Sequence, residues 1–358
     1  MGLERFAFMV HPLSVKDVSR KYKFARHFPD SWVETALRRL PPIKASHITG
    51  IRSPHNEVDG YFVSCTLTAR QIMTLPPEFV LKKVVATGRL AEKLGVQILG
   101  LGAFTKIVGD AGITVAKQLN IPVTTGNSYT VFTAVQGTKQ AAYLMGHKLS
   151  ASQAVVVGAT GAIGSVCAQM LAKEVGALTL VGRDRNKLEP LAERIRFDSG
   201  LAVRIESDLG KALKQADIVI TVTSAVDAII EPEHLKSGSV VCDVARPRDV
   251  SRRVVEIRDD VLVIEGGVVD VPGPPEFNLD FGFPPCTAYA CMAETMILTL
   301  EKRFESFTLG RNLAVKQVEE IGRLADKHGF KLAGFRSFER AIAPEDIDRI
   351  RESAQKHS

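Results

Sequence analysis

The sequence predicts an α/β protein with a Rossmann-type, doubly wound parallel sheet in the middle of the chain. Two observations favour this fold. After residue 150, short apolar strands alternate with helical patterns, and the first of these strands runs into a glycine-rich turn that opens an apolar helix. We expect an N-terminal α/β substrate domain before the sheet, and C-terminal helices that pack back across the cleft.

The bulk composition is that of an ordinary globular enzyme. The chain has 358 residues, of which 45% are apolar and 24% charged, enough for two domains with cores of their own. No apolar run reaches membrane-spanning length, and the N-terminus lacks a signal-peptide pattern, so we expect a cytoplasmic protein with no integral membrane segment. The five cysteines form no Cys-x-x-Cys pair, and no metal site is expected. The net charge of +6 comes without a Lys/Arg-rich block, so we expect no nucleic-acid partner. An acidic protein partner or a phosphorylated cofactor would explain the positive charge equally well.

The chain divides into five expected segments. They are a substrate domain, a linking helix, an NADP(H)-binding Rossmann domain, a loop with helices that carries the candidate nucleophile, and a peripheral tail, over residues 1–126, 127–149, 150–270, 271–330 and 331–358. Periodicity predicts strands at 96–99, 121–124, 154–157, 178–181, 202–205, 217–222, 239–243 and 261–264. It predicts helices at 82–94, 162–175, 186–195, 232–236, 287–307 and 315–328, with a proline-rich loop at 272–285.

The glycine-rich turn is the main cofactor signal. Residues 158–164 have the spacing G-x-x-G-x-x-G between an apolar strand and an apolar helix. Glycines allow the backbone to approach a pyrophosphate, and the helix N-terminus adds exposed N–H groups and positive charge. A glycine turn for packing alone is the alternative. The expected cofactor-binding residues are Gly158, Thr160, Gly161, Ala162, Ile163, Gly164, Arg183, Asn186, Lys187, Thr223 and Ser224.

The end of the next strand favours NADP(H) over NAD. An NAD enzyme usually has an acid there, but Arg183 comes first, with basic residues close behind. A guanidinium can pair with a 2′-phosphate, although a solvated basic helix start gives the same pattern and Asp184 leaves room for NAD. Thr223 and Ser224 lie at the end of a later core strand, where they could contact the nicotinamide half of the cofactor. Alternatively, they are ordinary turn residues.

The cysteines separate the possible reactions. Cys167 and Cys242 lie within a helix and a strand, which indicates core positions. Cys291 follows the proline-rich loop, and if Thr287 is the N-cap it lies about one turn into a helix, where the dipole favours a thiolate. A thiolate beside a hydride donor suggests acyl transfer to sulfur followed by reduction, but a buried small residue is the competing interpretation.

Several motifs resemble the cyanobacterial long-chain acyl-ACP reductases. They are the segments at 101–105, 125–130, 158–164, 266–269, 289–296, 310–312 and 328–330, in matching order between about residues 8 and 330. The resemblance implies that Cys291 is the nucleophile and that NADPH reduces a fatty acyl thioester to an aldehyde. The proline-rich loop and the tail after Phe330 depart from the family pattern. The acyl carrier, acyl-carrier protein or CoA, therefore stays open.

Two other resemblances are narrower. Residues 242–249 are similar to a strand-end segment of glutamyl-tRNA reductases, and residues 64–66, which include Cys65, to their nucleophile region. Shikimate-type dehydrogenases share the Rossmann half, but their substrate-binding lysine motif is not found. The sequence thus predicts an NADPH-dependent acyl-thioester reductase with Asn127 as a candidate oxyanion donor. The alternatives are a shikimate-like alcohol dehydrogenase and a non-catalytic NADP(H)-sensing protein.

Overall fold

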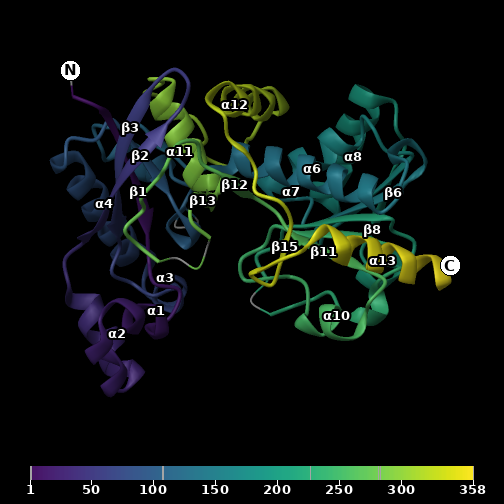
Figure 1. Cartoon of the computed structure of the whole chain (residues 1–358), viewed down its shortest axis with the longest axis horizontal. Coiled ribbons are helices and arrows are strands. Elements are labelled where there is room, and N and C mark those ends of the chain that lie inside the picture. The colour runs from purple at the N-terminus through teal and green to yellow at the C-terminus, as the bar shows by residue number, and fades with distance from the viewer. Residues whose placement is uncertain (1, 107–108, 226, 281, 283, 358) are drawn as a thin grey trace. The chain divides into compact units, whose positions relative to one another are not determined.

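The chain forms two compact units (Figure 1). A computed structural model describes residues 2–106, 109–225, 227–280, 282 and 284–357. Unit 1 consists of three stretches of chain, which are Met1–Gly126, Asp270–Asn312 and Ile321–Lys331. Unit 2 consists of Asn127–Val269, Leu313–Glu320 and Leu332–Ser358. The segment with Cys291 therefore belongs to unit 1, and the glycine-rich turn belongs to unit 2.

Unit 1 is built on a five-stranded sheet with the order β2-β3-β1-β4-β5. Its strands are β1 (Glu4–Val10), β2 (Ile43–Arg52), β3 (Glu57–Ser64), β4 (Ile98–Leu101) and β5 (Val123–Thr124). Only the pair β2 and β3 is antiparallel. The helical elements before β5 are α1 (Val15–Lys21), η1 (Lys23–His27), α2 (Asp30–Arg39), α3 (Ala69–Thr74), α4 (Pro77–Lys93), η2 (Ala103–Lys106) and α5 (Ile113–Lys117).

The alternation of side chains along β1 explains how both faces of this sheet are covered. Ala7 and Met9 are buried in a core with residues of α4, such as Val84. Phe8 points to the opposite face, where the Cβ positions of Gly100 and Gly102 lie against its ring. That face is covered by α11 (Ala290–Leu300), whose residues 292–300 are all buried. Helix α11 is therefore a core element of unit 1.

Unit 2 holds a six-stranded parallel sheet with the order β11-β10-β9-β6-β7-β8. The strands are β6 (Gln153–Val157), β7 (Ala177–Val181), β8 (Val203–Glu206), β9 (Ile218–Thr221), β10 (Val240–Asp243) and β11 (Leu262–Glu265). Chain order within the sheet is 3-2-1-4-5-6 when counted from β6, which is the Rossmann order. The predicted fold class is confirmed.

Helices cover both faces of this sheet (Figure 1). One face packs against α6 (Asn127–Leu144), α7 (Ala162–Leu171), α8 (Arg185–Ser199) and α13 (Pro344–Lys356). The other face packs against α9 (Leu209–Leu213), η4 (Pro232–His234) and α10 (Arg252–Ile257). A short turn, η3 (Leu149–Ala151), joins α6 to β6. Strands buried on both faces read as continuous apolar runs, which is why the sequence located them well.

The C-terminal third shows two differences from the sequence-based expectations. The predicted helix over 287–307 is shorter, because residues 287–289 form the strand β13 (Thr287–Tyr289) and α11 begins at Ala290. Thr287 is not its N-cap, since the Thr287 hydroxyl donates to the Pro284 carbonyl at 2.8 Å. The predicted helix over 232–236 is only the 3₁₀ turn η4, because Leu235 is already extended.

Among the remaining C-terminal elements, α12 (Val315–His328) was predicted, whereas the short strands were not, and the segment expected as a peripheral tail contributes Ile347 to the core of unit 2. Helix α12 has the predicted bounds and is followed by Gly329 with a φ of 86°. The short strands are β12 (Val268–Asp270), β14 (Lys331–Leu332), β15 (Arg336–Ser337) and β16 (Arg340–Ala341). Within the described ranges, every helix is too short or too polar to cross a bilayer.

Candidate active site

The glycine-rich turn joins β6 to α7 at the centre of the unit 2 sheet. The Gly158 N–H donates to the Val181 carbonyl at 3.0 Å, and the Gly161 N–H donates to the Gly158 carbonyl at 3.0 Å. The first intrahelical bond of α7 comes from Ser165, which donates to Gly161 at 2.9 Å. The N–H groups of Ala162, Ile163 and Gly164 therefore precede the helix ladder and are available to an anion.

Two glycines in this turn allow the backbone to pack more closely than a side chain would permit. Gly158 has a φ of 80°, and a Cβ there would lie 2.6 Å from the Val222 carbonyl oxygen. A Cβ on Gly164 would lie 2.4 Å from the Gly158 carbonyl oxygen. Both clashes are with backbone, so neither can be relieved by a rotamer change. Both glycines are therefore needed for the close packing of the turn, and the binding of a dinucleotide pyrophosphate there stays a prediction.

The end of β7 places basic residues beside the turn. The Thr160 methyl group lies 3.4 Å from a Cβ position on Gly182, so the turn and the start of Arg183 are neighbours. Arg183 is exposed, and among the described residues it makes no salt bridge. Arg185 and Lys187 are exposed but pair with Glu189 and Asp184, at 2.9 and 3.2 Å respectively. Arg183 is therefore the basic side chain best able to receive a phosphate, while Asn186 is exposed as the second residue of α8.

The loop after β9 is held by Asp249, which lies in the segment 242–249 but to which the sequence assigned no role. Asp249 is fully buried and accepts hydrogen bonds from the Thr221 hydroxyl at 2.6 Å and from the Thr223 N–H at 2.8 Å. The Thr223 hydroxyl also donates to Asp249. Thr223 is thus a structural residue of the loop, and Ser224 beside it is exposed. The signal available in the sequence was the unusual run of charged residues around Asp249.

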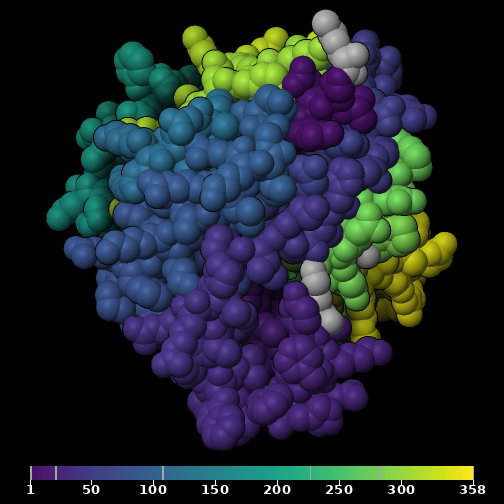
Figure 2. Space-filling model, turned by 90° about the vertical axis from the view of Figure 1, so that its left-hand side faces the viewer, coloured from purple at the N-terminus to yellow at the C-terminus, as the bar shows by residue number. Residues whose placement is uncertain are grey.

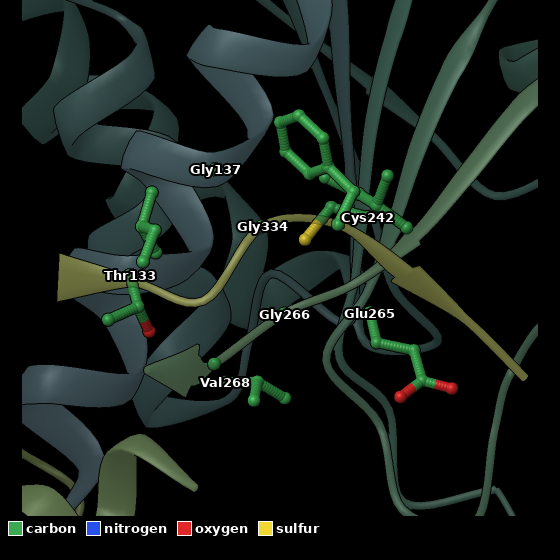
Figure 3. Close-up of a pocket in the computed structure, with 11 residues that line it drawn as sticks. Thr133, Gly137, Cys242, Glu265, Gly266, Val268 and Gly334 are labelled. Atoms are coloured by element: carbon green, nitrogen blue, oxygen red, sulfur yellow. The ribbon is translucent and has the colours of Figure 1, made fainter. Parts of the chain in front are cut away.

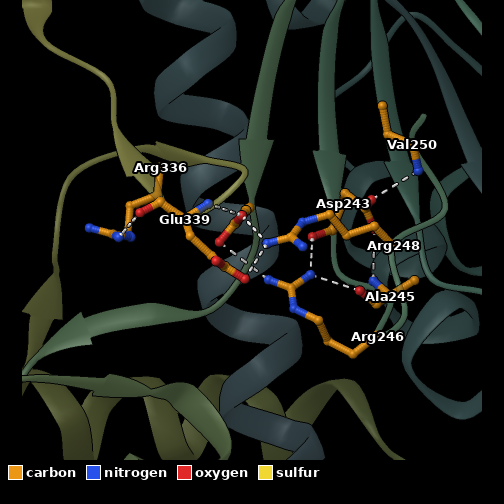
Figure 4. A network of polar contacts seen from close by, with 8 residues as sticks. Asp243, Ala245, Arg246, Arg248, Val250, Arg336 and Glu339 are labelled. Carbon is orange, nitrogen blue, oxygen red and sulfur yellow. Dashed lines mark hydrogen bonds and ion pairs between the residues drawn. The ribbon is translucent and has the colours of Figure 1, made fainter. Parts of the chain in front are cut away.

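A polar network lies at the ends of β10 and β11 (Figure 4). Glu265 pairs with Arg248 at 2.7 Å and with Arg246 at 3.4 Å, and it accepts the Glu339 N–H at 2.8 Å. Burial works against the charged carboxylate, but the two arginines outweigh it and hold the pKa of Glu265 below its ordinary value. The hairpin of β15 and β16 is thereby attached to the Rossmann sheet.

Asp243 belongs to the same region but behaves differently. Its carboxylate accepts the Ala245 and Val250 N–H groups, each at 3.0 Å (Figure 4). Burial nevertheless raises the pKa of Asp243 to about 6. Asp243 therefore titrates close to neutral pH, and it fixes the path of the chain that leads to Asp249.

A small pocket lies beside this network within unit 2 (Figure 3). Residues from α6, the strand ends and the C-terminal segment line it, including Thr133, Cys242, Gly266 and Phe335. Cys242 is buried, and burial raises the pKa of its thiol to about 12. The thiol is therefore protonated at neutral pH, which agrees with the prediction that Cys242 is a core residue.

Cys291 lies in the first turn of α11 and packs against a sharp turn of the backbone. Gly126 has a φ of 72°, and a Cβ there would lie 2.3 Å from the Cys291 Cα and 2.4 Å from its Cβ. Only glycine fits this contact, because both the conformation and the space exclude a side chain. The Cys291 side chain is half-buried. The helix begins one residue before it, so its thiol is closer to the helix N-terminus than the sequence suggested.

Two charged groups act on the Cys291 thiol. Burial raises the pKa of Cys291, the Lys106 ammonium opposes this rise, and the Glu294 carboxylate adds to it. Glu294 is fully buried and accepts hydrogen bonds from the hydroxyls of Thr124 and Thr308. These bonds tie α11 to Thr124, two residues before Gly126, and to the segment that follows α11. The helix dipole alone therefore does not produce a thiolate here, contrary to the expectation from the sequence.

The other cysteines are either more deeply buried than Cys291 or less strongly supported as the nucleophile. Cys167 is fully buried in α7 and its thiol pKa is raised by burial, in agreement with the predicted core position. Cys65 is fully buried just after β3, and burial raises its thiol pKa as well. Cys286 is half-buried, with a φ of 63°, in the segment before α11.

Asn127 is the first residue of α6 and is buried. It follows Gly126 directly in the chain, although it belongs to unit 2 and Gly126 to unit 1. Its proposed role as an oxyanion donor therefore stays a prediction.

Comparisons with known proteins place this chain among NAD(P)-dependent reductases. The sequence pattern of the family Shikimate / quinate 5-dehydrogenase matches residues 139–265. The chain is 27% identical over 334 residues to a long-chain acyl-[acyl-carrier-protein] reductase of Synechococcus elongatus, which covers 88% of this chain and 94% of that protein. It is thus a distant relative of that enzyme.

Two further relatives share only part of their length. Aminotransferase PigE of Serratia sp. is 34% identical over 267 residues, which cover 72% of this chain but 30% of PigE. A glutamyl-tRNA reductase of Methanococcus aeolicus is 35% identical over 106 residues, which cover 29% of this chain and 27% of that enzyme. Together with the glycine-rich turn, these similarities identify unit 2 as an NAD(P)-binding Rossmann domain. The chain is therefore an NAD(P)-dependent oxidoreductase, similar to glutamyl-tRNA reductases over part of its length and to an acyl-ACP reductase along most of it.

Proposed function

We propose that this protein is an NADPH-dependent reductase that converts a fatty acyl thioester, carried by acyl-carrier protein or CoA, to an aldehyde. The observation that carries the proposal is the placement of Cys291, a half-buried thiol in the first turn of α11 that is packed against Gly126. The similarity to a long-chain acyl-ACP reductase along most of the chain supports it. The proposal assigns no chain length.

Cys291 acts as the nucleophile in this proposal. The thiol loses its proton, and the sulfur attacks the thioester carbonyl carbon, so that a new C–S bond forms and the carrier thiol leaves with a proton. Burial favours the protonated thiol, while Lys106 and the first-turn position act in the opposite direction and favour the thiolate. Gly126 and the Glu294 contacts hold the helix start in place. Asn127 is the proposed donor to the carbonyl oxygen as it becomes negative.

NADPH, when bound, supplies the hydride that reduces the acyl group on sulfur. The resulting hemithioacetal then loses its C–S bond, which releases the aldehyde and returns the electron pair to the Cys291 sulfur. The proposed phosphate contacts are the N–H groups at the start of α7, with Arg183 binding the 2′-phosphate. Ser224 is a proposed nicotinamide or ribose neighbour.

The Cys291→Ser variant provides the central test. We expect it to fold, to bind NADPH with unchanged affinity and to lose aldehyde formation by more than a hundredfold, because a serine hydroxyl without an adjacent base is a weak nucleophile. Aldehyde is measured by gas chromatography after incubation with NADPH and a panel of acyl-CoAs and acyl-ACPs. Mass spectrometry after acyl thioester alone should find the acyl group on the peptide that holds Cys291.

Cys286→Ser and Cys65→Ser serve as controls and should keep most of the activity. Acylation of Cys65 instead would move the mechanism to the arrangement suggested by the glutamyl-tRNA reductase resemblance. Full activity of Cys291→Ser would remove the covalent mechanism.

A shikimate-like alcohol dehydrogenase is the second candidate, because the matching family pattern over residues 139–265 is that of such enzymes. That reaction needs no cysteine. Oxidation of a hydroxylated substrate by both wild type and Cys291→Ser, without aldehyde from any thioester, would favour it.

A further inference from the structure

The helical segment between β1 and β2 places large aromatic side chains in solvent. Phe24 and Trp32 are 66% and 67% exposed, and Phe28 and Tyr22 are 49% and 40% exposed. Among the described aromatic side chains, the only others classed as exposed are Tyr143 and Phe197, far away in sequence. We call these four residues, from Tyr22 to Trp32, the aromatic patch.

In this segment the small apolar side chains are buried and the large aromatic ones are exposed, the reverse of an ordinary helical pair. Its buried core consists only of the small group Val15, Ala25, Val33 and Leu37. The larger rings, which would contribute most if buried, point outward instead. The rings of Tyr22 and Phe24 lie 6.1 Å apart, and Phe28 and Trp32 follow within the next eight residues. Exposed apolar side chains gathered in one short segment are typical of a binding surface. Figure 2 shows the segment, in purple, projecting from the rest of unit 1.

Exposed basic side chains occur in the same segment as the aromatic patch. Residues 13–40 contain seven Lys and Arg residues but only three Asp and Glu residues, in a chain whose net charge is +6. One of the three acids, Glu34, is buried and paired with Arg70. Lys16, Arg20, Lys23 and Arg26 are all exposed. The surface is therefore both aromatic and positively charged.

We propose that the aromatic patch and its basic neighbours bind the surface of an anionic lipid bilayer. Trp, Tyr and Phe partition into the interfacial region of a membrane, and Lys and Arg are attracted to anionic headgroups. A projecting surface can enter this region without a shaped partner, and its rings and its charges both meet favourable surroundings there. A bilayer would also dissolve a long-chain aldehyde, and this consequence alone rests on the proposed function.

The single tryptophan of the chain makes the proposal directly measurable. Trp32 is the only Trp in the sequence, so intrinsic tryptophan fluorescence reports on the aromatic patch alone. The full chain, without substrate, is titrated with vesicles of equal parts phosphatidylcholine and phosphatidylglycerol. We expect a blue shift of the emission and quenching by brominated acyl chains. Pure phosphatidylcholine vesicles should bind far more weakly, and high salt should weaken binding to the anionic vesicles.

Substitutions within the patch test the two kinds of side chain separately. Lys23→Gln combined with Arg26→Gln should lower the partition coefficient about 30-fold, since each basic residue near an anionic surface contributes about 1 kcal/mol. Phe24→Ala combined with Phe28→Ala should reduce the blue shift and lower the partition coefficient at least tenfold.

The matched control lies on α8 of unit 2, where Arg194, Arg196 and Phe197 are exposed. Arg194→Gln with Arg196→Gln removes the same charge as the test pair, and Phe197→Ala removes one exposed ring; both should leave binding unchanged. Circular dichroism checks that each variant is folded, and the charge variants test the proposal even if the Phe pair does not fold. Absence of a blue shift with anionic vesicles, or equal binding to neutral ones, would overturn the proposal. Loss of binding in the α8 variants would do so as well.

Discussion

Replacement of Arg183 by Ala should change cofactor preference rather than cofactor binding as a whole. Arg183 is exposed at the end of β7, beside the glycine-rich turn, and among the described side chains none pairs with it. Its guanidinium is therefore free to bind the 2′-phosphate that distinguishes NADPH from NADH. Because NADH lacks this phosphate, the variant should lose affinity for NADPH alone.

The structure sets the size of this effect. A hydrogen bond to a charged group contributes about 1.5–3 kcal/mol, which corresponds to roughly ten- to a hundredfold in Kd. Exposure of the Arg183 side chain favours the lower end of this range, so we expect about tenfold weaker NADPH binding. Arg185 provides a matched control two residues away, because it pairs with Glu189 at 2.9 Å. Arg185→Ala should change the NADPH affinity by less than about twofold.

The assay is a fluorescence titration of each variant with NADPH and with NADH at constant ionic strength. Wild type should bind NADPH more tightly, and Arg183→Ala should bring the two dissociation constants close together. An equal loss of affinity for both cofactors would show that Arg183 supports the site without binding the 2′-phosphate. A larger effect of Arg185→Ala than of Arg183→Ala would refute the assignment of the phosphate ligand.

Three further predictions follow from the packing and electrostatics. Gly164→Ala should weaken NADPH binding at least tenfold while the protein stays folded, because its Cβ would lie 2.4 Å from a backbone oxygen; Gly161→Ala, at 3.3 Å, should weaken it less in the same titration. Gly126→Ala should abolish aldehyde formation and lower the free energy of unfolding by about 2–4 kcal/mol, since strain at positive φ adds to overpacking against Cys291. Burial raises the pKa of Asp243 to about 6, so the stability contributed by its protonated form is present below about pH 4 and lost as the pH rises through about 6. Urea denaturation should therefore show Asp243→Asn gaining up to about 3 kcal/mol relative to wild type between pH 4 and pH 7.

The Rossmann sheet of unit 2 could be predicted from the sequence because its strands are buried on both faces. Runs such as those of β6 and β10 are continuously apolar, and glycine-rich turns mark where strands end. The sheet of unit 1 was mostly missed. In β2, buried and partly exposed positions alternate irregularly, and β-bulges interrupt its pairing with β3, so no simple period appears. The segment from α1 to α2 gave no clear helical pattern because its largest apolar residues are exposed.

Some residues of the candidate site could be predicted from local sequence patterns, whereas others depend on contacts between distant parts of the chain. The glycine-rich turn is a local feature, so its residues could be recognised from their spacing. Asp249 could not, because its function is to accept hydrogen bonds from Thr221 and Thr223, which precede it by more than 25 residues. The contact between Gly126 and Cys291 joins positions 165 residues apart, and the burial that raises the Cys291 pKa arises only when α11 packs into unit 1. A sequence motif can therefore name a nucleophile, but its reactivity depends on desolvation and charges that the tertiary structure supplies. For Cys291 these act in opposite directions, since burial favours the thiol and Lys106 favours the thiolate.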